Sequence, residues 1–176
     1  FMSVNFLISQ TSGAFIARMD ADDVAHKDRF KEQINYLRGN PEISILGSNC
    51  VIIDENNEIT SRRIMPEYDE KIQKNILLFN NINHPTVMMR KEVFKKNSYN
   101  ERFKTSQDWE LWLNLSFHNF KFHNLQRDLI KYRMDSNYAL KKSFRYRYNE
   151  LKIKLKYFFK YPFLMSITSL IPTLIL

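Results

Sequence analysis

"GAFIARMDADD", residues 13–23, sets three aspartates directly after a short apolar run. The run predicts a buried strand. Because side chains alternate along an extended chain, Asp20 and Asp22 are expected to point to one side and Asp23 to the other. Two carboxylates on one side can converge on a hard cation such as Mg²⁺ or Mn²⁺, which in turn binds substrate phosphates. In the structural alternative, Asp22 or Asp23 closes a turn or caps the helix that follows.

The segments around these aspartates alternate between strand and helix patterns. Helices are predicted over residues 28–39, 67–79, 106–119 and 144–158, and strands over 13–19, 43–54, 59–64, 84–90 and 120–134. Strands interleaved with helices predict an α/β fold.

Two of the predicted helices carry clear apolar spacing. In the helix at 28–39, Phe30, Ile34 and Leu37 recur at helical spacing, and Gly39 is expected to cap the C-terminal end. The last helix is predicted to be amphipathic, with Lys on its other faces. Its apolar stripe consists of Phe144, Tyr148, Leu151, Leu155 and Phe158.

The positive charge of the chain is concentrated near its C-terminal end. The formal net charge is +8, and residues 141–160 alone hold eight Lys or Arg against one Glu. The sixteen residues that follow, 161–176, carry no charged side chain. A basic segment beside an apolar one is typical of attachment to a membrane surface, and it argues against a nucleic-acid partner. In the alternative, this segment packs on the rest of the chain or on another subunit.

Cysteine and glycine usage excludes other classes of protein. The single cysteine, Cys50, excludes an internal disulfide and fits a reducing, cytoplasmic location. With three glycines in the chain, neither a phosphate-binding Walker loop nor a dinucleotide fingerprint can be written.

Several motifs occur in an order that resembles the family-2 glycosyltransferases of the GT-A fold. They are "FIARMDADDVAHKDRFKEQINYL" (15–37), "ILGSN" (45–49), "NHPTVMMRK" (83–91), "SQDWELW" (106–112) and "YR" (132–133). The chain departs from the family pattern at Leu7, where a Gly is usual, and at Lys27, where a Pro is common. The resemblance implies a mixed, Rossmann-related sheet flanked by helices. It also implies that residues 1–140 are the later part of a catalytic domain, with the upstream nucleotide-binding segment missing. Residues 141–176 are then a basic amphipathic helix and an apolar membrane-associating tail.

The resemblance also implies roles for the acidic residues and the arginine. Asp20 and Asp22 would bind the sugar-nucleotide donor and a divalent cation, Mn²⁺ or Mg²⁺, and Arg133 would meet the donor's diphosphate. Asp108 would be the catalytic base. For Arg133, the alternative that it is only a surface charge at the end of a strand carries the same weight as contact with the diphosphate.

For the remaining candidate residues, a structural role is an alternative to the functional one. Asp108 could cap its helix, because Thr105 and Asp108 form an approximate capping box. Asp23 and His84 are expected as neighbours of the site, although His84 could bind metal, meet the acceptor or close a turn. Trp109 and Trp112 are expected in the core.

These expectations combine into one leading function. It is an inverting, metal-dependent glycosyltransferase that moves a sugar from a nucleotide-diphosphate sugar to a saccharide or lipid-linked acceptor in cell-surface polysaccharide biosynthesis. The enzyme would be cytoplasmic and peripheral to the inner face of the cell membrane. The alternative is a non-catalytic membrane-associated scaffold or an inactive fragment of such an enzyme. A basic RNA-binding protein is disfavoured because the positive charge is confined to the tail.

Overall fold

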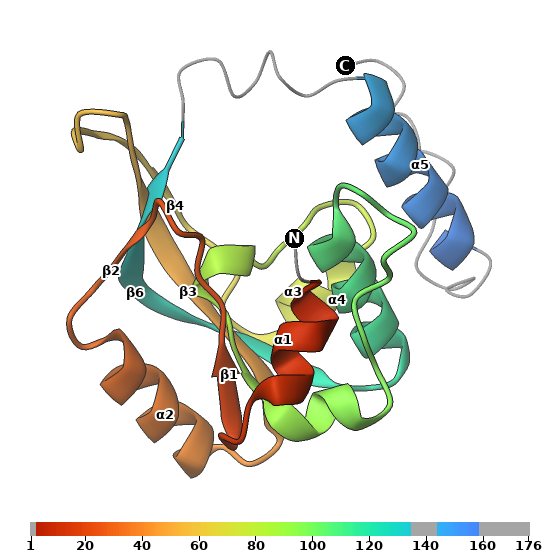
Figure 1. Cartoon of the computed structure of the whole chain (residues 1–176), viewed down its shortest axis with the longest axis horizontal. Coiled ribbons are helices and arrows are strands. Elements are labelled where there is room, and N and C mark those ends of the chain that lie inside the picture. The colour runs from red at the N-terminus through yellow and green to blue at the C-terminus, as the bar shows by residue number, and fades with distance from the viewer. Residues whose placement is uncertain (1–2, 135–143, 159–176) are drawn as a thin grey trace.

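The computed structural model of the chain describes residues 3–134 and 144–158 (Figure 1). The helices are α1 (Val4–Gln10), α2 (Arg29–Gly39), α3 (Asp69–Asn75), α4 (Gln107–Phe117) and α5 (Phe144–Phe158), with 3₁₀ turns η1 (His84–Thr86) and η2 (Lys91–Lys95). The strands are β1 (Phe15–Ala17), β2 (Val24–Ala25), β3 (Ile43–Ile53), β4 (Ile59–Arg63), β5 (Met88–Arg90) and β6 (Lys121–Arg133). The predicted apolar tail at 161–176 lies outside the described residues.

The six strands form one mixed sheet, which confirms the predicted α/β fold. The strand order is β1-β5-β3-β6-β2, and β4 pairs with β3 off this path. β3 and β6 run parallel, whereas all the other pairs are antiparallel. The central strand β3 is buried along most of its length, as its nearly continuous apolar sequence predicts.

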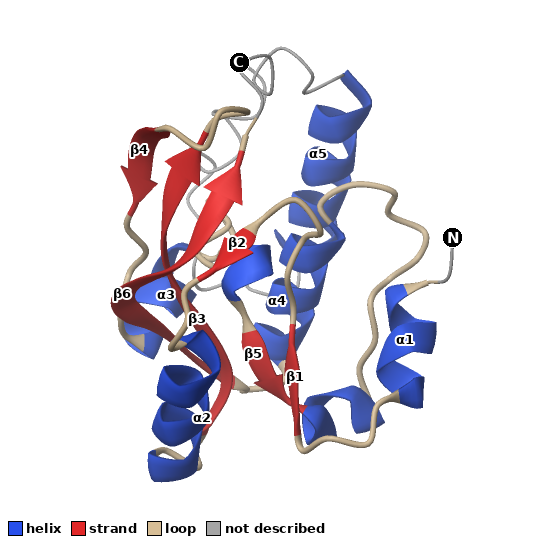
Figure 2. Cartoon of the chain, turned by 60° about the vertical axis from the view of Figure 1, so that its left-hand side comes forward, coloured by secondary structure: helices blue, strands red, loops and turns tan. Residues whose placement is uncertain are grey.

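Helices cover both faces of this sheet (Figure 2). Leu37 of α2 packs with Leu46 and Met88 on one face. On the other face, Ile45 and Phe122 pack against α3 and α4. Adjacent residues of β3 therefore enter different cores, as strand geometry requires.

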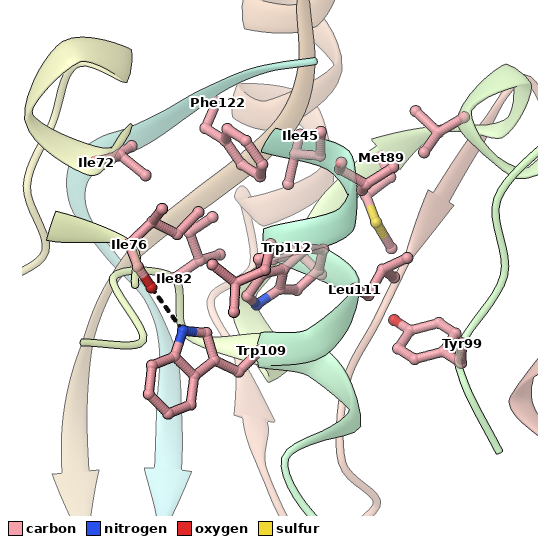
Figure 3. Close-up of a cluster of buried hydrophobic side chains, with 14 of the residues drawn as sticks. Ile45, Ile72, Ile76, Ile82, Met89, Tyr99, Trp109, Leu111, Trp112 and Phe122 are labelled. Atoms are coloured by element: carbon pink, nitrogen blue, oxygen red, sulfur yellow. Dashed lines mark hydrogen bonds between the residues drawn. The ribbon is translucent and has the colours of Figure 1, made fainter. Parts of the chain in front are cut away.

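The larger core lies between the sheet and α4 (Figure 3). Trp112 is fully buried, and Trp109 is buried with its indole N–H donating to the carbonyl of Ile76 at 2.7 Å. These contacts confirm that both tryptophans belong to the core.

Helix α2 forms where it was predicted, but it turns a polar face inward. Arg29, Gln33 and Leu37 are buried, whereas Phe30 is 57% exposed. The expected glycine cap is wrong, because Gly39 is the last helical residue and Asn40 is the cap, with its side-chain amide donating to the Tyr36 carbonyl at 2.8 Å.

Helix α5 also forms as predicted, and its predicted apolar stripe is partly exposed and partly half-buried. Ile153 and Tyr157 are fully buried, whereas Tyr148 and Leu155 of the stripe are exposed. The reason lies on α4, where the buried carboxylate of Glu110 needs polar partners. The Tyr157 hydroxyl donates to it at 2.9 Å and the Lys156 ammonium pairs with it. No helix among the described residues is long and apolar enough to cross a membrane.

The backbone of Gly47 on β3 lies so close to the side chain of Asn124 that a residue with a Cβ would clash there. A Cβ at this position would lie 2.2 Å from Oδ1 of Asn124. Asn124 cannot easily move, because its amide donates to the carbonyls of Pro66 and Asn81 at 2.8 and 3.1 Å.

We expect Gly47→Ala to lower the free energy of unfolding by about 1–3 kcal/mol, the usual cost of overpacking a tight interior. Chemical denaturation measures this loss. The control is Gly39→Ala, where a Cβ meets nothing within 4 Å and alanine suits a helix. Equal unfolding midpoints for the two variants would show that Asn124 yields at little cost.

Candidate active site

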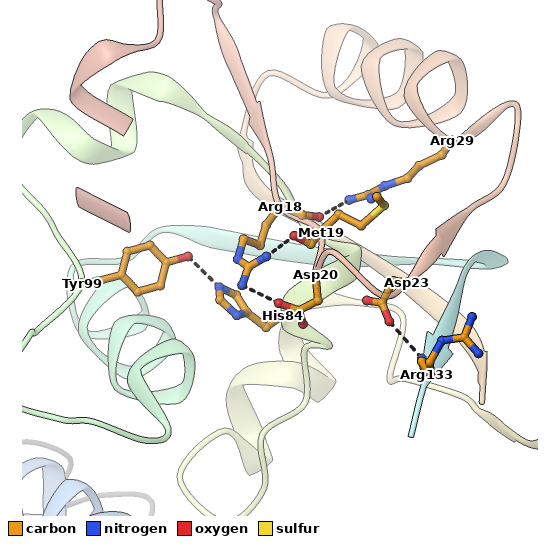
Figure 4. A network of polar contacts seen from close by, with 8 residues as sticks. All are labelled: Arg18, Met19, Asp20, Asp23, Arg29, His84, Tyr99 and Arg133. Atoms are coloured by element: carbon orange, nitrogen blue, oxygen red, sulfur yellow. Dashed lines mark hydrogen bonds and ion pairs between the residues drawn. The ribbon is translucent and has the colours of Figure 1, made fainter. Parts of the chain in front are cut away.

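The three aspartates lie in the loop that joins β1 to β2, the strands at the two ends of the strand order. Figure 4 shows Asp20 and Asp23 of this loop. Asp20 is half-buried and pairs with the guanidinium of Arg18 at 2.6 Å. Arg18 also donates to the carbonyl of Met19, so it is held against the loop. Asp22 is exposed. Asp20 therefore already has a cationic partner, whereas the Asp22 carboxylate faces solvent.

Asp23 is turned inward and ties the loop to the sheet. It is buried, and its Oδ1 accepts the backbone N–H of Arg133 on β6 at 2.9 Å. Burial raises the pKa of Asp23, and the charges of Asp20 and Asp22 raise it further, whereas the hydrogen bond from Arg133 lowers it. The structure thus gives Asp23 a contact that holds the loop.

Arg133 lies beside the same loop, with its guanidinium donors taken by protein oxygens. Nε donates to the Asp22 carbonyl at 3.0 Å, Nη1 to the Asp54 carbonyl at 2.7 Å and Nη2 to the Asn57 side chain at 2.7 Å. These bonds fix the backbone of Asp22 against the β3–β4 turn. Contact between Arg133 and a diphosphate stays a prediction.

Arg29 and Gln33, the Arg-X-X-X-Gln pattern on α2, make hydrogen bonds that support the loop after β1. Arg29 is buried and donates to the Arg18 carbonyl at 2.6 Å and to Gln33 Oε1 at 3.0 Å. Gln33 in turn donates to the carbonyls of Thr86 and Leu46 at 2.8 and 3.3 Å. Burial lowers the pKa of Arg29 to about 10, with the charge of Asp23 acting in the opposite direction. Arg29 and Gln33 thus donate hydrogen bonds to backbone carbonyls just after β1 and in η1. These bonds join the loop after β1 to the segment that carries His84.

Asp108 lies in the first turn of α4 and is not part of a capping box. The cap residue is Ser106, which has left-handed backbone angles and makes no side-chain capping bond. Thr105 instead accepts a hydrogen bond from Asn149 of α5 at 2.9 Å. The carboxylate of Asp108 accepts from the amide of Asn80 at 2.7 Å. The proposed capping role is therefore wrong, and Asn80 is a partner that sequence reasoning missed.

His84 lies beside Asp20 and Arg18 of the loop after β1 (Figure 4). Its Nε2 is 2.8 Å from the hydroxyl of Tyr99. Burial lowers the pKa of His84, whereas the charges of Asp108 and Asp20 raise it. The hydrogen bond between Asn80 and Asp108 joins the start of α4 to the segment that leads to His84, and Figure 4 shows Asp20 of the loop after β1 beside the same histidine. The chemical roles of the two carboxylates stay predictions.

A second group of possible metal ligands lies at the start of α2. Ligand atoms of His26, Asp28 and Glu32 all lie within 4.8 Å of one another. His26 Nδ1 accepts the backbone N–H of Asp28 at 3.2 Å, and Glu32 pairs with Arg127 at 3.1 Å. Sequence reasoning assigned these residues no role, and the structure leaves two candidate positions for a cation.

Comparisons with known proteins agree with this geometry. The family model for glycosyl transferase family 2 matches residues 2–98. The chain is 32% identical over 159 residues to the uncharacterized glycosyltransferase MJ1057 of Methanocaldococcus jannaschii, covering 88% of this chain and 55% of that protein. It is 31% identical over 147 residues to the O-antigen biosynthesis glycosyltransferase WbnJ of Escherichia coli, covering 82% and 57%. A crystal structure of S. aureus TarS 1-349 in complex with UDP-GlcNAc is similar at a TM-score of 0.59 and 14% identity, covering 88% of this chain and 45% of that one.

The mixed sheet with its flanking helices and acidic loop places the chain among α/β proteins of the GT-A type. More narrowly, the chain belongs to glycosyl transferase family 2. This confirms the resemblance found in the motifs. The chain spans about half the length of the curated relatives it matches. That an upstream nucleotide-binding segment lies outside it stays a prediction.

Proposed function

We propose that the protein transfers a sugar from a nucleotide-diphosphate sugar to a saccharide or lipid-linked acceptor, with inversion at the anomeric carbon. One observation carries the proposal: Asp20, after β1, lies beside His84 (Figure 4), and Asp108, at the start of α4, accepts a hydrogen bond from Asn80 in the segment that leads to His84. A donor-binding carboxylate and a base must face one reacting centre, and this arrangement supports those two roles for Asp20 and Asp108. A sugar-nucleotide donor is supported by the similarity to TarS, which has been crystallised with UDP-GlcNAc.

Asp20 and Asp22 are the residues we expect to hold a divalent cation. Their carboxylate oxygens are the ligands that Mg²⁺ and Mn²⁺ prefer. The exposed Asp22 can accept a cation directly, whereas a cation at Asp20 would share its carboxylate with Arg18 or displace the arginine. When bound there, the cation would stabilise the negative charge of the departing diphosphate.

Asp108 would act as the base. Its carboxylate takes the proton of the acceptor hydroxyl while that oxygen forms a bond to the anomeric carbon and the bond to the nucleoside diphosphate breaks. A single displacement of this kind inverts the anomeric configuration. The hydrogen bond from Asn80 holds one carboxylate oxygen, which leaves the other to receive the proton.

Synthesis of a cell-surface polysaccharide is the setting we propose. WbnJ is named for O-antigen biosynthesis, and AmsE of Erwinia amylovora, 30% identical over 128 residues, is named for amylovoran biosynthesis. A lipid-linked acceptor is supported by a further relative, 24% identical, whose name gives a diphosphoundecaprenol substrate.

We further propose that α5 lies against the inner face of the cell membrane. Its exposed side presents Tyr148 and Leu155, and Lys152 lies over the Tyr148 ring at 4.4 Å. Apolar side chains beside lysines suit a surface of anionic lipid.

We expect the full chain to sediment with vesicles of phosphatidylcholine and phosphatidylglycerol but not with phosphatidylcholine alone. Lys152→Glu should weaken this binding roughly five- to tenfold, since each basic side chain near such a surface contributes about 1 kcal/mol. Lys31→Glu on α2, an exposed lysine far from α5 in the chain, is the control. Equal binding to both kinds of vesicle would contradict the proposed placement.

Donor binding with and without Mn²⁺ tests the proposed function against the scaffold alternative. We expect UDP-sugars to bind measurably only when Mn²⁺ or Mg²⁺ is present, and EDTA to reverse the binding. A well-folded protein that binds no sugar nucleotide from a broad panel under either condition would support a non-catalytic scaffold instead.

A further inference from the structure

The hydrogen bond between His84 and Tyr99 is built into the protein interior. Tyr99 is buried, and its ring stacks on Phe94 with the centroids 6.2 Å apart. His84 packs edge-on against the fully buried Trp112, with ring centroids 6.0 Å apart. His84 is half-buried and Tyr99 is buried, so the packing around both rings favours the 2.8 Å contact between His84 Nε2 and the Tyr99 hydroxyl.

Helix α1 holds the backbone of Tyr99 in place as well. The side chain of Asn5 accepts the backbone N–H of Tyr99 at 2.8 Å and donates to its carbonyl at 2.8 Å. This two-point contact joins residues 94 positions apart in the sequence. It fixes the position from which the phenol meets His84.

The protonation state of the Tyr99 hydroxyl determines which of the two residues donates the hydrogen bond between Tyr99 and His84. Burial raises the pKa of Tyr99, and the charge of Asp108 raises it further, so the hydroxyl keeps its proton. Within the described part of the chain, His84 is the partner of that hydroxyl. A buried O–H without an acceptor is costly, so the phenol donates and Nε2 accepts. Neutral imidazole carries one proton, which must then be on Nδ1.

The charged groups around His84 make its second nitrogen relevant to the reaction. Asp108 at the start of α4, and Asp20 and Arg18 in the segment after β1, all contribute to its electrostatic environment. Figure 4 shows the His84 ring between Tyr99 on one side and Arg18 with Asp20 on the other. A hydrogen-bond donor here lies beside the proposed donor-binding carboxylate of Asp20, in the segment that Asn80 joins to the proposed base, Asp108.

We propose that Tyr99 is a positioning residue that holds His84 as its Nδ1–H tautomer, so that this N–H donates to a substrate oxygen between Asp20 and Asp108. The role in catalysis rests on the proposed function, whereas the tautomer does not. One consequence is that His84 is not a metal ligand, because one ring nitrogen accepts from Tyr99 and the other carries the proton.

Histidine tautomers can be read directly by long-range ¹H–¹⁵N NMR of the full chain. The chain has four histidines, and the spectrum of His84→Gln identifies the signals of this one. We expect the Nδ1–H pattern in the wild type, and a mixture or the opposite tautomer in Tyr99→Phe. Tyr157→Phe is the matched control, because it removes another buried hydroxyl, which donates to Glu110 at 2.9 Å. An Nε2–H pattern in the wild type, or an unchanged spectrum in Tyr99→Phe, would overturn the proposal.

Kinetics test the positioning role separately. We expect Tyr99→Phe to lower kcat about three- to tenfold, the size of one hydrogen bond's net contribution, with the donor KM nearly unchanged. Tyr157→Phe should leave kcat unchanged. A tautomer change without a change in kcat would refute the positioning role. If the wild type shows the Nδ1–H pattern but transfers no sugar, the proposed function fails while the assigned tautomer stands.

Discussion

Asp108→Asn should lower kcat by about 10²- to 10⁴-fold, the usual contribution of a positioned general base, while donor binding and fold remain intact. The substitution keeps the size of the side chain, and the amide oxygen of asparagine can still accept the hydrogen bond that Asn80 donates at 2.7 Å. What it removes is the ability to take a proton from the acceptor hydroxyl. Steady-state kinetics with a saturating UDP-sugar, together with thermal unfolding, separates lost chemistry from lost stability.

A control for this substitution lies on β6. Asp128→Asn removes another carboxylate, one that pairs with Arg62 at 2.8 Å outside the proposed site. We expect it to leave kcat near the wild-type value, because Asp128 lies outside the proposed site. The fold should also stay intact, because surface ion pairs contribute little to stability. If Asp108→Asn and Asp128→Asn have equal kcat values, Asp108 is not the base.

The position of these acids in the fold could be predicted because it depends on local sequence. The apolar run before Asp20 predicts a strand and the periodic residues after Ser106 predict α4, so both acids were placed beside the correct elements. The expectation that this strand is buried is wrong, because β1 lies at the edge of the sheet and is only half-buried. The spacing of apolar residues in a short stretch of sequence indicates whether that stretch forms a strand or a helix, and this is enough to locate the element.

The polar contacts that join these elements could not be predicted in the same way. Asn5 and Tyr99 meet across 94 positions, and Asn80 meets Asp108 across 28. Neither pair has a spacing that a single sequence reveals. The helix α1 that carries Asn5 was not predicted, because its seven residues show no extended apolar pattern.

Apolar spacing predicted helix α5 but not the residues that pack it against α4. Tyr148 and Leu155 of the predicted stripe are exposed, whereas Leu151 and Phe158 are half-buried. Tyr157 and Lys156, which lie outside the stripe, bind the carboxylate of Glu110. On α2 the buried Arg29 and Gln33 likewise displace Phe30 from the interior. In both helices, a polar group that must be satisfied in the interior determines which side of the helix faces inward.

Asp22→Asn should abolish Mn²⁺-dependent binding of a UDP-sugar, whereas Asp28→Asn should leave it unchanged. The two variants separate the two candidate cation positions, because Asp28 belongs to the group at the start of α2 with His26 and Glu32. Asp22 is exposed, and the contact that Arg133 makes there is with its backbone carbonyl, so the loop should keep its shape in the variant.

Titration calorimetry of UDP-sugar at several Mn²⁺ concentrations measures this difference. We expect a loss of at least about a hundredfold in apparent affinity for Asp22→Asn, since the cation and the diphosphate are bound together and removal of one charged ligand weakens both. The opposite result, with binding lost in Asp28→Asn and kept in Asp22→Asn, would move the metal to the start of α2. Asp20 would then be explained by its ion pair with Arg18 alone, and the acids after β1 would serve to shape the loop.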